Sequence, residues 1–384
     1  ASRPGPRARP SRAPASPDRV ASPRSPGGMR GLVRLADRAV LRVAGEGSGK
    51  FLQGLCTQDV GVLASRPAAA AAFLSPKGRV LCDAILVSGG KDEVLVDCHS
   101  AVSKSLMRLL LRHRLREPLT IEDVSGSHAP VALLPRGAVP GEAAAEPAVP
   151  AEFFPDPRFA AMGHRAILEA GAADGLCSAG AAGDGANSAG LPAYHFWRLC
   201  CAVPEGPADM PVDTVLPLHA NLDLLDFVSF EKGCYVGQEL TARTKHRGAV
   251  RRRFFSVVSA AVDPEDFLTS LQLPPHLPLP AAAVQAAGGQ PLPSAAPPGG
   301  VAAPEEERVV HGLRPEGGEP EAVGALHSAS GPVGLCLLRS KAAYNEAEQL
   351  KEPPLPAGTR LATAGGLPLA LRPPPYAFAG AGAA

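Results

Sequence analysis

Three stretches of low-complexity sequence divide this chain and set the main limit on its fold. They cover residues 135–150, 170–191 and 264–319, and Ala, Gly and Pro dominate each of them. Such composition lacks the apolar periodicity of helices and strands and is typical of loops, insertions or linkers. The core must therefore come from the blocks between them. Among these, residues 194–258 have the highest density of patterned sequence.

The length of 384 residues and the apolar content of 45% suit two domains, or one domain with long insertions. Basic and acidic residues nearly cancel, at 38 against 37, so no overall field favours nucleic acid or an anionic membrane. Apolar runs such as 68–74 are far shorter than the roughly 20 residues of a membrane-spanning helix. We therefore expect no nucleic-acid partner and no membrane insertion.

Hydrophobic periodicity predicts strands over 32–43, 79–87 and 92–98, and an amphipathic helix over 102–112. Another helix is predicted to start at Ser48, with Phe51, Leu52 and Leu55 on one face. Near the C-terminus, segments 322–328, 334–339 and 359–371 have the pattern of short strands joined by turns. The chain is therefore predicted to end in a small β domain.

Residues 1–30 contain seven arginines and a single acid, Asp18, in a background of Ser, Pro and Ala. This composition is typical of an organelle transit segment, and the alternative is a disordered basic tail. The eight cysteines have no CxxC spacing, which favours a reduced compartment over a disulfide framework.

The run 232–239, Lys-Gly-Cys-Tyr-Val-Gly-Gln-Glu, is the strongest candidate for a functional centre. Residues 238–244 can form a helix with Glu239 and Arg243 paired at i,i+4, which places the Cys234 thiol near a helix N-terminus. The helix dipole and nearby cations would favour the thiolate. From chemistry alone, a reactive thiol and a small residue in a tight glycine turn are equally good interpretations.

Two other features leave alternatives open. Asp83 lies within an apolar strand pattern, so it is either a ligand-facing acid or a carboxylate satisfied by internal partners. The basic segment 245–253 is interpreted as a solvated rim that could face one acidic ligand or partner.

The sequence around Cys234 closely resembles the folate-binding-like iron-sulfur cluster assembly factors of mitochondria. These are relatives of the glycine cleavage aminomethyltransferase, the T-protein. The resemblance rests on residues 229–239, with supporting matches at Asn221-Leu222-Asp223, at 51–59 and at 74–79.

The resemblance implies an α+β fold, with a folate-binding core of ferredoxin-like subdomains and a small C-terminal β-barrel. The corresponding division has a transit or disordered segment at 1–30 and a folate-binding-like domain at 31–255. A barrel domain at 256–375 and a tail at 376–384 follow. The core would carry insertions near 135–150 and 170–191, and the barrel a disordered insertion near 264–319.

The resemblance also assigns site residues. Cys234 is the expected functional thiol, with Lys232, Gln238 and Glu239 beside it in the motif. Asp83, Arg198 and Arg243 are expected to line a folate-like pocket. Cys82 and Cys200 stand where the T-protein has acidic residues that contact folate, which weakens the case for one-carbon transfer.

Three hypotheses follow. In the first, the chain is an assembly factor of the mitochondrial matrix that matures [4Fe-4S] proteins such as aconitase and lipoate synthase, with a link to heme biosynthesis. Its partners would be A-type carrier proteins, and Cys234 would be a transient iron or cluster ligand shared with the partner, because a lone thiolate seldom holds a cluster. The second is a tetrahydrofolate-dependent one-carbon transferase. The third is an interaction module without chemistry.

Overall fold

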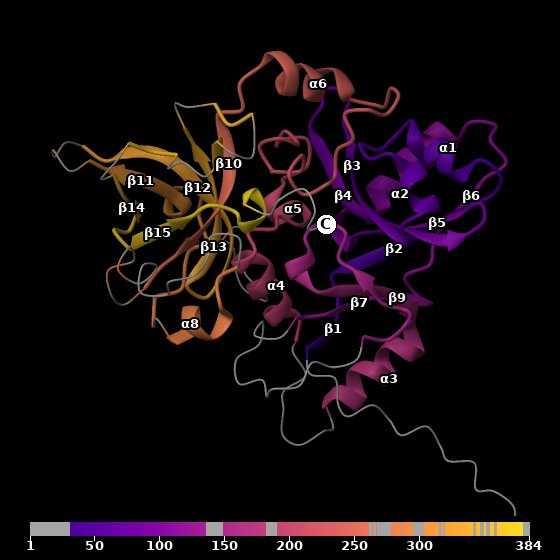
Figure 1. The fold of residues 1–384 in the computed structure, drawn as a ribbon, viewed down its shortest axis with the longest axis horizontal. Helices are drawn as coiled ribbons and strands as arrows, with labels where there is room; N and C mark the ends of the chain where they lie inside the picture. Colours follow the sequence, from indigo (N-terminus) through magenta and orange to yellow (C-terminus); the bar gives the residue numbers. More distant parts are fainter. Residues whose placement is uncertain are drawn as a thin grey trace, which may run out of the picture.

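The computed structural model (Figure 1) describes residues 31–135, 149–181 and 190–260 continuously. Within the C-terminal part it describes residues 263, 266, 278–286, 288–294, 303–314, 317, 319–340, 343–345, 349–350, 354–356 and 359–378. The predicted transit segment 1–30 and most of the predicted insertion 135–150 lie outside these residues.

A five-stranded antiparallel sheet forms one side of the N-terminal half, in the order β3-β4-β5-β2-β6. Its strands are β2 (Arg38–Ala44), β3 (Ala68–Leu74), β4 (Val80–Gly90), β5 (Glu93–His99) and β6 (Thr120–Asp123). Helices α1 (Ser48–Gln53) and α2 (Ser100–Arg114) cover one face, where Leu52, Leu106 and Leu110 join the core. The turn η1 (Val60–Ala64) leads into β3. An amphipathic helix packs its apolar stripe against a sheet because this removes the apolar side chains from water.

A four-stranded sheet lies beside it, in the order β1-β7-β9-β8. Its strands are β1 (Leu32–Arg34), β7 (His128–Leu133), β8 (Phe154–Pro155) and β9 (His164–Glu169), with η2 (Ala160–Met162) before β9. The single strand predicted over 32–43 is therefore wrong: β1 and β2 belong to different sheets, and a turn at Asp37 separates them.

Helix α3 (Ala170–Ala181) corrects a second expectation, because it falls within the stretch 170–191 that was predicted to be a loop or insertion. Ala173 is buried and Leu176 and Cys177 pack against the core of the four-stranded sheet. The Ala-rich composition supports the helix, since Ala has the highest helix propensity.

The C-terminal part is a closed six-stranded barrel in the order β10-β13-β12-β11-β14-β15. Its strands are β10 (Arg252–Val258), β11 (Val309–Leu313), β12 (Glu321–Ser330), β13 (Val333–Arg339), β14 (Arg360–Thr363) and β15 (Pro368–Arg372). The predicted disordered insertion 264–319 thus contains barrel strand β11, together with α8 (Ala281–Ala286) and η3 (Glu306–Arg308). Closure requires β11, because it pairs with both β12 and β14.

The predicted tail also begins later than expected. Tyr376, within η5 (Pro375–Ala377), is buried. Its hydroxyl donates to the carbonyl of Ala202 at 2.9 Å and accepts from Asn221 at 2.9 Å. A residue bonded in this way belongs to the packed structure and not to a free end.

Helices α4 (Leu191–Cys200), α5 (Gly206–Asp209) and α6 (Gln238–Arg247) come from the segment between the sheets and the barrel. Figure 1 shows α4 and α5 between the barrel and the two sheets, and α6 along one edge of the molecule. Trp197 and Leu199 of α4 share one core with Val33 of β1 and Val333 of β13. None of the described helices is long and apolar enough to cross a bilayer.

Candidate functional site

Cys234 differs from the other cysteines in its exposure. All eight cysteines lie in the described part of the chain and none forms a disulfide. Six are buried and Cys177 is half-buried, whereas the thiol of Cys234 is on an exposed residue. Burial raises the pKa of Cys56 to about 11 and also raises the pKa of the Cys200 and Cys201 thiols. Those thiols are therefore poor ligands or nucleophiles, because the thiolate is the reactive form.

Lys232 fixes the loop that carries Cys234. Its ammonium group donates to three backbone carbonyl oxygens, those of Gln53 at 2.7 Å, Cys56 at 2.8 Å and Gln58 at 2.7 Å. The same group lies 5.0 Å from the centre of the Tyr235 ring. Burial lowers the pKa of Lys232. All three donors of the ammonium are used, so Lys232 fastens the loop and has no free donor for a substrate.

Backbone contacts hold both sides of the loop. The amide of Ser229 donates to the carbonyl of Thr57 at 3.0 Å, and the amide of Val236 donates to the carbonyl of Gly54 at 3.2 Å. Gly237 has a φ of 81°, and a Cβ atom there would lie 2.4 Å from the carbonyl oxygen of Ser75. Only glycine satisfies both conditions, which explains the residue at this point of the motif.

Helix α6 begins directly after this loop, as predicted, with Gly237 as its N-cap. Gln238 is its first residue and Glu239 an exposed acid in its first turn, where a carboxylate complements the helix dipole. The predicted pairing of Glu239 with Arg243 is not among the ion pairs of the described residues, and Arg243 is exposed. The predicted thiol motif therefore forms one local unit with Cys234 at its surface.

Asp83, by contrast, is satisfied from inside the protein. Its side chain accepts from Arg38 at 3.3 Å and from the amide of Gly206 at 2.9 Å. Asp83 is buried, so the alternative of an internally satisfied carboxylate is the correct one.

Asp83 is the edge of a larger buried network that sequence reasoning missed. Asp97 of β5 accepts from Arg38 at 2.7 Å and from Arg165 of β9 at 2.7 Å, so the contact joins the two sheets. Glu205 accepts from Arg158 and from the hydroxyl of Tyr194. A signal existed, because Arg38 and Arg165 interrupt apolar strand patterns just as Asp83 does.

Electrostatics keep Glu205 of this network ionised. Burial alone would raise the pKa of Glu205, but four arginines hold it well below its usual value: Arg38, Arg158, Arg165 and Arg198. Burial raises the pKa of Tyr194 to about 12, so it stays a neutral donor. Burying a charged side chain removes its hydration, and the attraction between opposite charges offsets this cost only when each charged group has a partner.

Arg198, the second expected pocket residue, also has internal partners. Its guanidinium donates to Asp209 at 2.6 Å, to the carbonyl of Val203 at 3.1 Å and to His195 at 3.0 Å. Asp83 and Arg198 are both buried, whereas Arg243 is exposed on α6. The structure does not bring these three residues into one solvent-open pocket.

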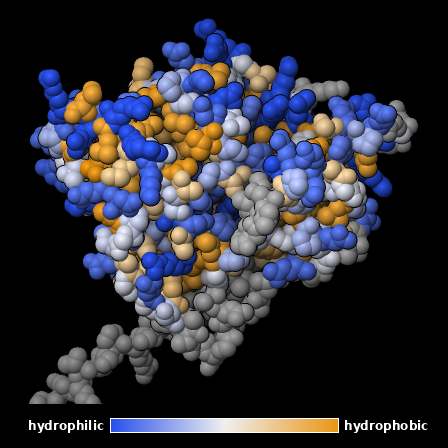
Figure 2. Space-filling model, turned by 180° about the vertical axis from the view of Figure 1, so that it is seen from behind, coloured by the Kyte–Doolittle hydropathy of each residue, from blue (hydrophilic) through white to orange (hydrophobic). Residues whose placement is uncertain are grey.

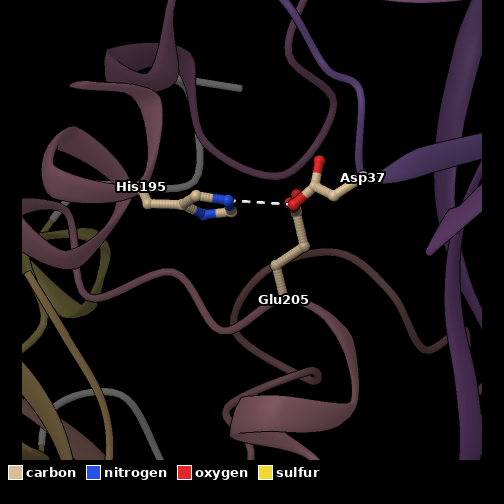
Figure 3. Close-up of side chains that lie close together, drawn as sticks. All are labelled: Asp37, His195 and Glu205. Atoms are coloured by element: carbon tan, nitrogen blue, oxygen red, sulfur yellow. Dashed lines mark ion pairs between the residues drawn. The ribbon is translucent and has the colours of Figure 1, made fainter. Parts of the chain in front are cut away.

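One group of side chains in the described residues has the composition of a metal site: Asp37, His195 and Glu205. Figure 3 shows the His195 imidazole facing the two carboxylates, with Nε2 at 2.9 Å from Asp37. Its Nδ1 accepts from Arg198, which places the ring proton on Nε2 and directs it at Asp37. Both ring nitrogens are therefore engaged, and the arrangement favours a hydrogen-bonded His195 over a metal ligand.

Comparison with known proteins shows what the chain as a whole is similar to. No protein-family model matches the chain. Over 242 residues it is 37% identical to the mitochondrial iron-sulfur cluster assembly factor IBA57 of Mus musculus and to that of Homo sapiens. These alignments cover 58% of this chain and 65% of each relative. The Mycosarcoma maydis homolog is 32% identical over 266 residues, covering 64% of this chain and 63% of that protein.

The predicted resemblance is confirmed. The chain is similar in sequence to the mitochondrial iron-sulfur cluster assembly factors, and it spans about 65% of the mammalian ones. Their names also support the predicted mitochondrial location.

A solved structure supports the predicted fold. The glycine cleavage system aminomethyltransferase T from Bartonella henselae aligns with a TM-score of 0.59, over 91% of this chain and 87% of that protein. The sequence identity is 15%, so the likeness concerns the fold alone. The α+β core followed by a closed β-barrel is therefore the T-protein fold.

Proposed function

We propose that this chain acts in iron-sulfur cluster assembly in the mitochondrial matrix, with Cys234 as its functional thiol. The observation that carries the proposal is that one cysteine of eight is exposed, on a loop fastened by Lys232 through three carbonyl oxygens. A rigid mount suits a transient ligand, because a preorganised thiol loses little conformational freedom when it binds. The names of the sequence relatives support the same role.

A single exposed thiol also defines how a cluster could bind. Iron-sulfur clusters normally take four protein ligands, and the other seven cysteines of this chain are buried or half-buried. The remaining ligands would come from a partner, and A-type carrier proteins are the proposed source. Cys234 would lose its thiol proton to solvent as its sulfur binds iron.

We further propose that the products are [4Fe-4S] proteins such as aconitase and lipoate synthase, with a secondary effect on heme biosynthesis. The test is complementation of cells that lack this protein, with aconitase activity and protein lipoylation as readouts. We expect Cys234→Ser to abolish rescue and Cys177→Ser, at the half-buried cysteine of α3, to restore it. Full rescue by Cys234→Ser and Cys234→Ala would refute the proposal.

A tetrahydrofolate-dependent transferase is the second candidate, and its T-protein fold is the observation in its favour. Against it, Asp83 and Arg198 have internal partners. This candidate predicts that calorimetry detects tetrahydrofolate binding and that Asp83→Asn weakens it. The absence of binding heat at high tetrahydrofolate concentration would eliminate it.

A further inference from the structure

Seven basic side chains gather around α6 and the first barrel strand, and the proposed thiol chemistry does not use them. We call this group the basic surface; it consists of Lys77, Arg79, Arg243, Arg247, Arg251, Arg252 and Arg339. Arg79 is half-buried and the other six are exposed. The sequence contains no acid between Glu239 and Asp263, so the positive charge of this segment is not interrupted.

Two of these residues, Lys77 and Arg79, lie near the start of α6, the helix that follows the Cys234 loop. Lys77 and Arg79 flank Gly78, where a Cβ atom would lie 2.9 Å from the Leu240 side chain of α6. Arg243 and Arg247 are four residues apart on α6, so they lie on one face of the helix. Hydrophilic side chains project along the upper edge of Figure 2, the edge that α6 occupies in Figure 1.

These cations are not neutralised within the described structure. Arg252 lies directly opposite Arg339 in the pairing of β10 with β13, and like charges in that position destabilise a sheet. None of the seven side chains forms an ion pair with an acid among the described residues. The acids of the neighbouring segments, Glu231, Glu239 and Asp213, are therefore not paired with them. The dipole of α6 accounts only for Arg247, which lies at its C-terminus.

The pKa of His219 provides a second indication of the positive charge of these side chains. This pKa is lowered to about 4, first by burial and then by the charges of Arg252, Arg253 and Arg79. Arg253 is paired with Asp223, whereas Arg79 and Arg252 form no ion pair with any acid in the part of the chain that the structure describes. The positive charges therefore add at this place, although the whole chain carries a net charge of only +1.

We propose that the basic surface docks an acidic face of the protein that supplies the remaining cluster ligands to Cys234. This inference rests on the proposed function, because it places the docking surface beside the thiol that would share the cluster. A nucleic acid or an anionic membrane would not use a thiol next to its binding surface. A protein that shares a cluster with this chain would use one. Complementary charge at the rim mainly accelerates association and selects the partner.

The test compares two triple variants that remove the same charge. The first changes Arg247, Arg251 and Arg252 to Gln. The control changes Lys104, Arg112 and Arg116 to Gln, at exposed positions on and just after α2. Binding to an A-type carrier that holds a [2Fe-2S] cluster is measured anaerobically, as an association rate and a Kd over a range of salt concentrations.

We expect the first variant to bind about tenfold more weakly and with a smaller salt dependence, because each exposed ion pair changes binding by up to about fivefold. The control should stay within about twofold of wild type. Equal affinity and salt dependence of the first variant would overturn this inference alone. Failure of the wild-type chain to bind the carrier would overturn it together with the proposed partner.

A second experiment with lipid vesicles tests whether the basic surface binds an anionic membrane instead of an acidic protein. The wild-type chain and the first variant are mixed with phosphatidylcholine vesicles containing cardiolipin. We expect no retention of either protein at physiological salt. Charge-dependent retention on the vesicles, with unchanged carrier binding by the variant, would overturn the inference.

Discussion

Lys232 explains how a chain can expose a cysteine without leaving it on a mobile segment. The backbone carbonyls that it contacts belong to Gln53, Cys56 and Gln58, around the end of α1, while Cys234 lies two residues away in the sequence. Each contact is a hydrogen bond to a charged donor, and such bonds are roughly twice as strong as neutral ones. We infer that Lys232 is a positioning residue and Cys234 the reacting one.

Replacing Lys232 with Met tests this role. The substitution keeps much of the apolar stem but removes the donors for three carbonyl oxygens, so we expect a loss of about 2 kcal/mol in the free energy of unfolding. Lys104→Met, at an exposed position of α2, should change it by less than about 0.5 kcal/mol. Urea denaturation measures both, and equal stability of the two variants would show that Lys232 does not fasten the loop.

At this scale, sequence reasoning located the motif but not the purpose of each residue. From chemistry alone, Cys234 between two glycines left two interpretations open, and the resemblance favoured the functional thiol. The partners of Lys232 lie about 175 residues away in the sequence, and the Asp83 partners Arg38 and Gly206 are also remote. Long-range pairs of this kind are set by the tertiary fold, which local patterns do not encode.

Between elements, the main connection is the buried ion pair that joins the two N-terminal sheets. Asp97 of β5 accepts from Arg38 of β2 in its own sheet and from Arg165 of β9 in the other sheet. All three residues are buried. The ion pair therefore fixes the position of one sheet relative to the other, and the Cys234 loop and α4 pack on these two sheets.

Asp97→Asn should remove the charge of the carboxylate that the buried Arg38 and Arg165 share. We expect a loss of about 3 to 5 kcal/mol in the free energy of unfolding, as for other broken buried pairs. The matched control is Glu93→Gln on the same strand, because Glu93 pairs with Arg42 within one sheet and both side chains are partly exposed. That change should cost less than about 1 kcal/mol. Calorimetry that finds the same loss in both variants would contradict the assignment.

Gly237 makes a separate prediction about the start of α6. Gly237→Ala puts a Cβ atom against the Ser75 carbonyl oxygen at a positive φ, so we expect a loss of about 2 kcal/mol and altered alkylation kinetics of Cys234. Gly233→Ala meets nothing within 4 Å and should be nearly neutral in both measurements. A Gly237→Ala variant with wild-type stability and wild-type alkylation rate would refute the proposed backbone constraint.

Some elements could not be predicted because composition and context disagree. Strand β3 contains five consecutive alanines, the best helix formers, yet all seven of its residues are buried in a sheet. Its pairing with β4 and the apolar surfaces around it outweigh local propensity. Helix α3 shows the reverse case, where an Ala- and Gly-rich segment forms a helix because Ala173 and its neighbours find a core to cover.

For the whole molecule, the sequence predicted the class of fold better than its boundaries. The α+β core and the C-terminal barrel were predicted by resemblance, and the structural comparison confirms them. The barrel extends into the predicted insertion through β11 and into the predicted tail through the packing of Tyr376. Low complexity hides such segments, since barrel strands of four or five residues need only two or three inward side chains.

The arrangement at this scale leaves one chemically accessible thiol on a mixed α+β body. Seven thiols are withdrawn from solvent to different degrees, and the eighth is exposed on the loop that precedes α6. The central claim is that Cys234 is a cluster ligand shared with a partner protein.

Anaerobic reconstitution with iron, sulfide and an A-type carrier tests that claim most directly, using absorption and Mössbauer spectroscopy of the isolated complex. Wild type and Cys177→Ser should form a complex that contains a cluster. Cys234→Ser should yield a carrier cluster with the spectrum of the carrier alone and no stable complex with this chain. An identical cluster-containing complex with Cys234→Ser would contradict the account.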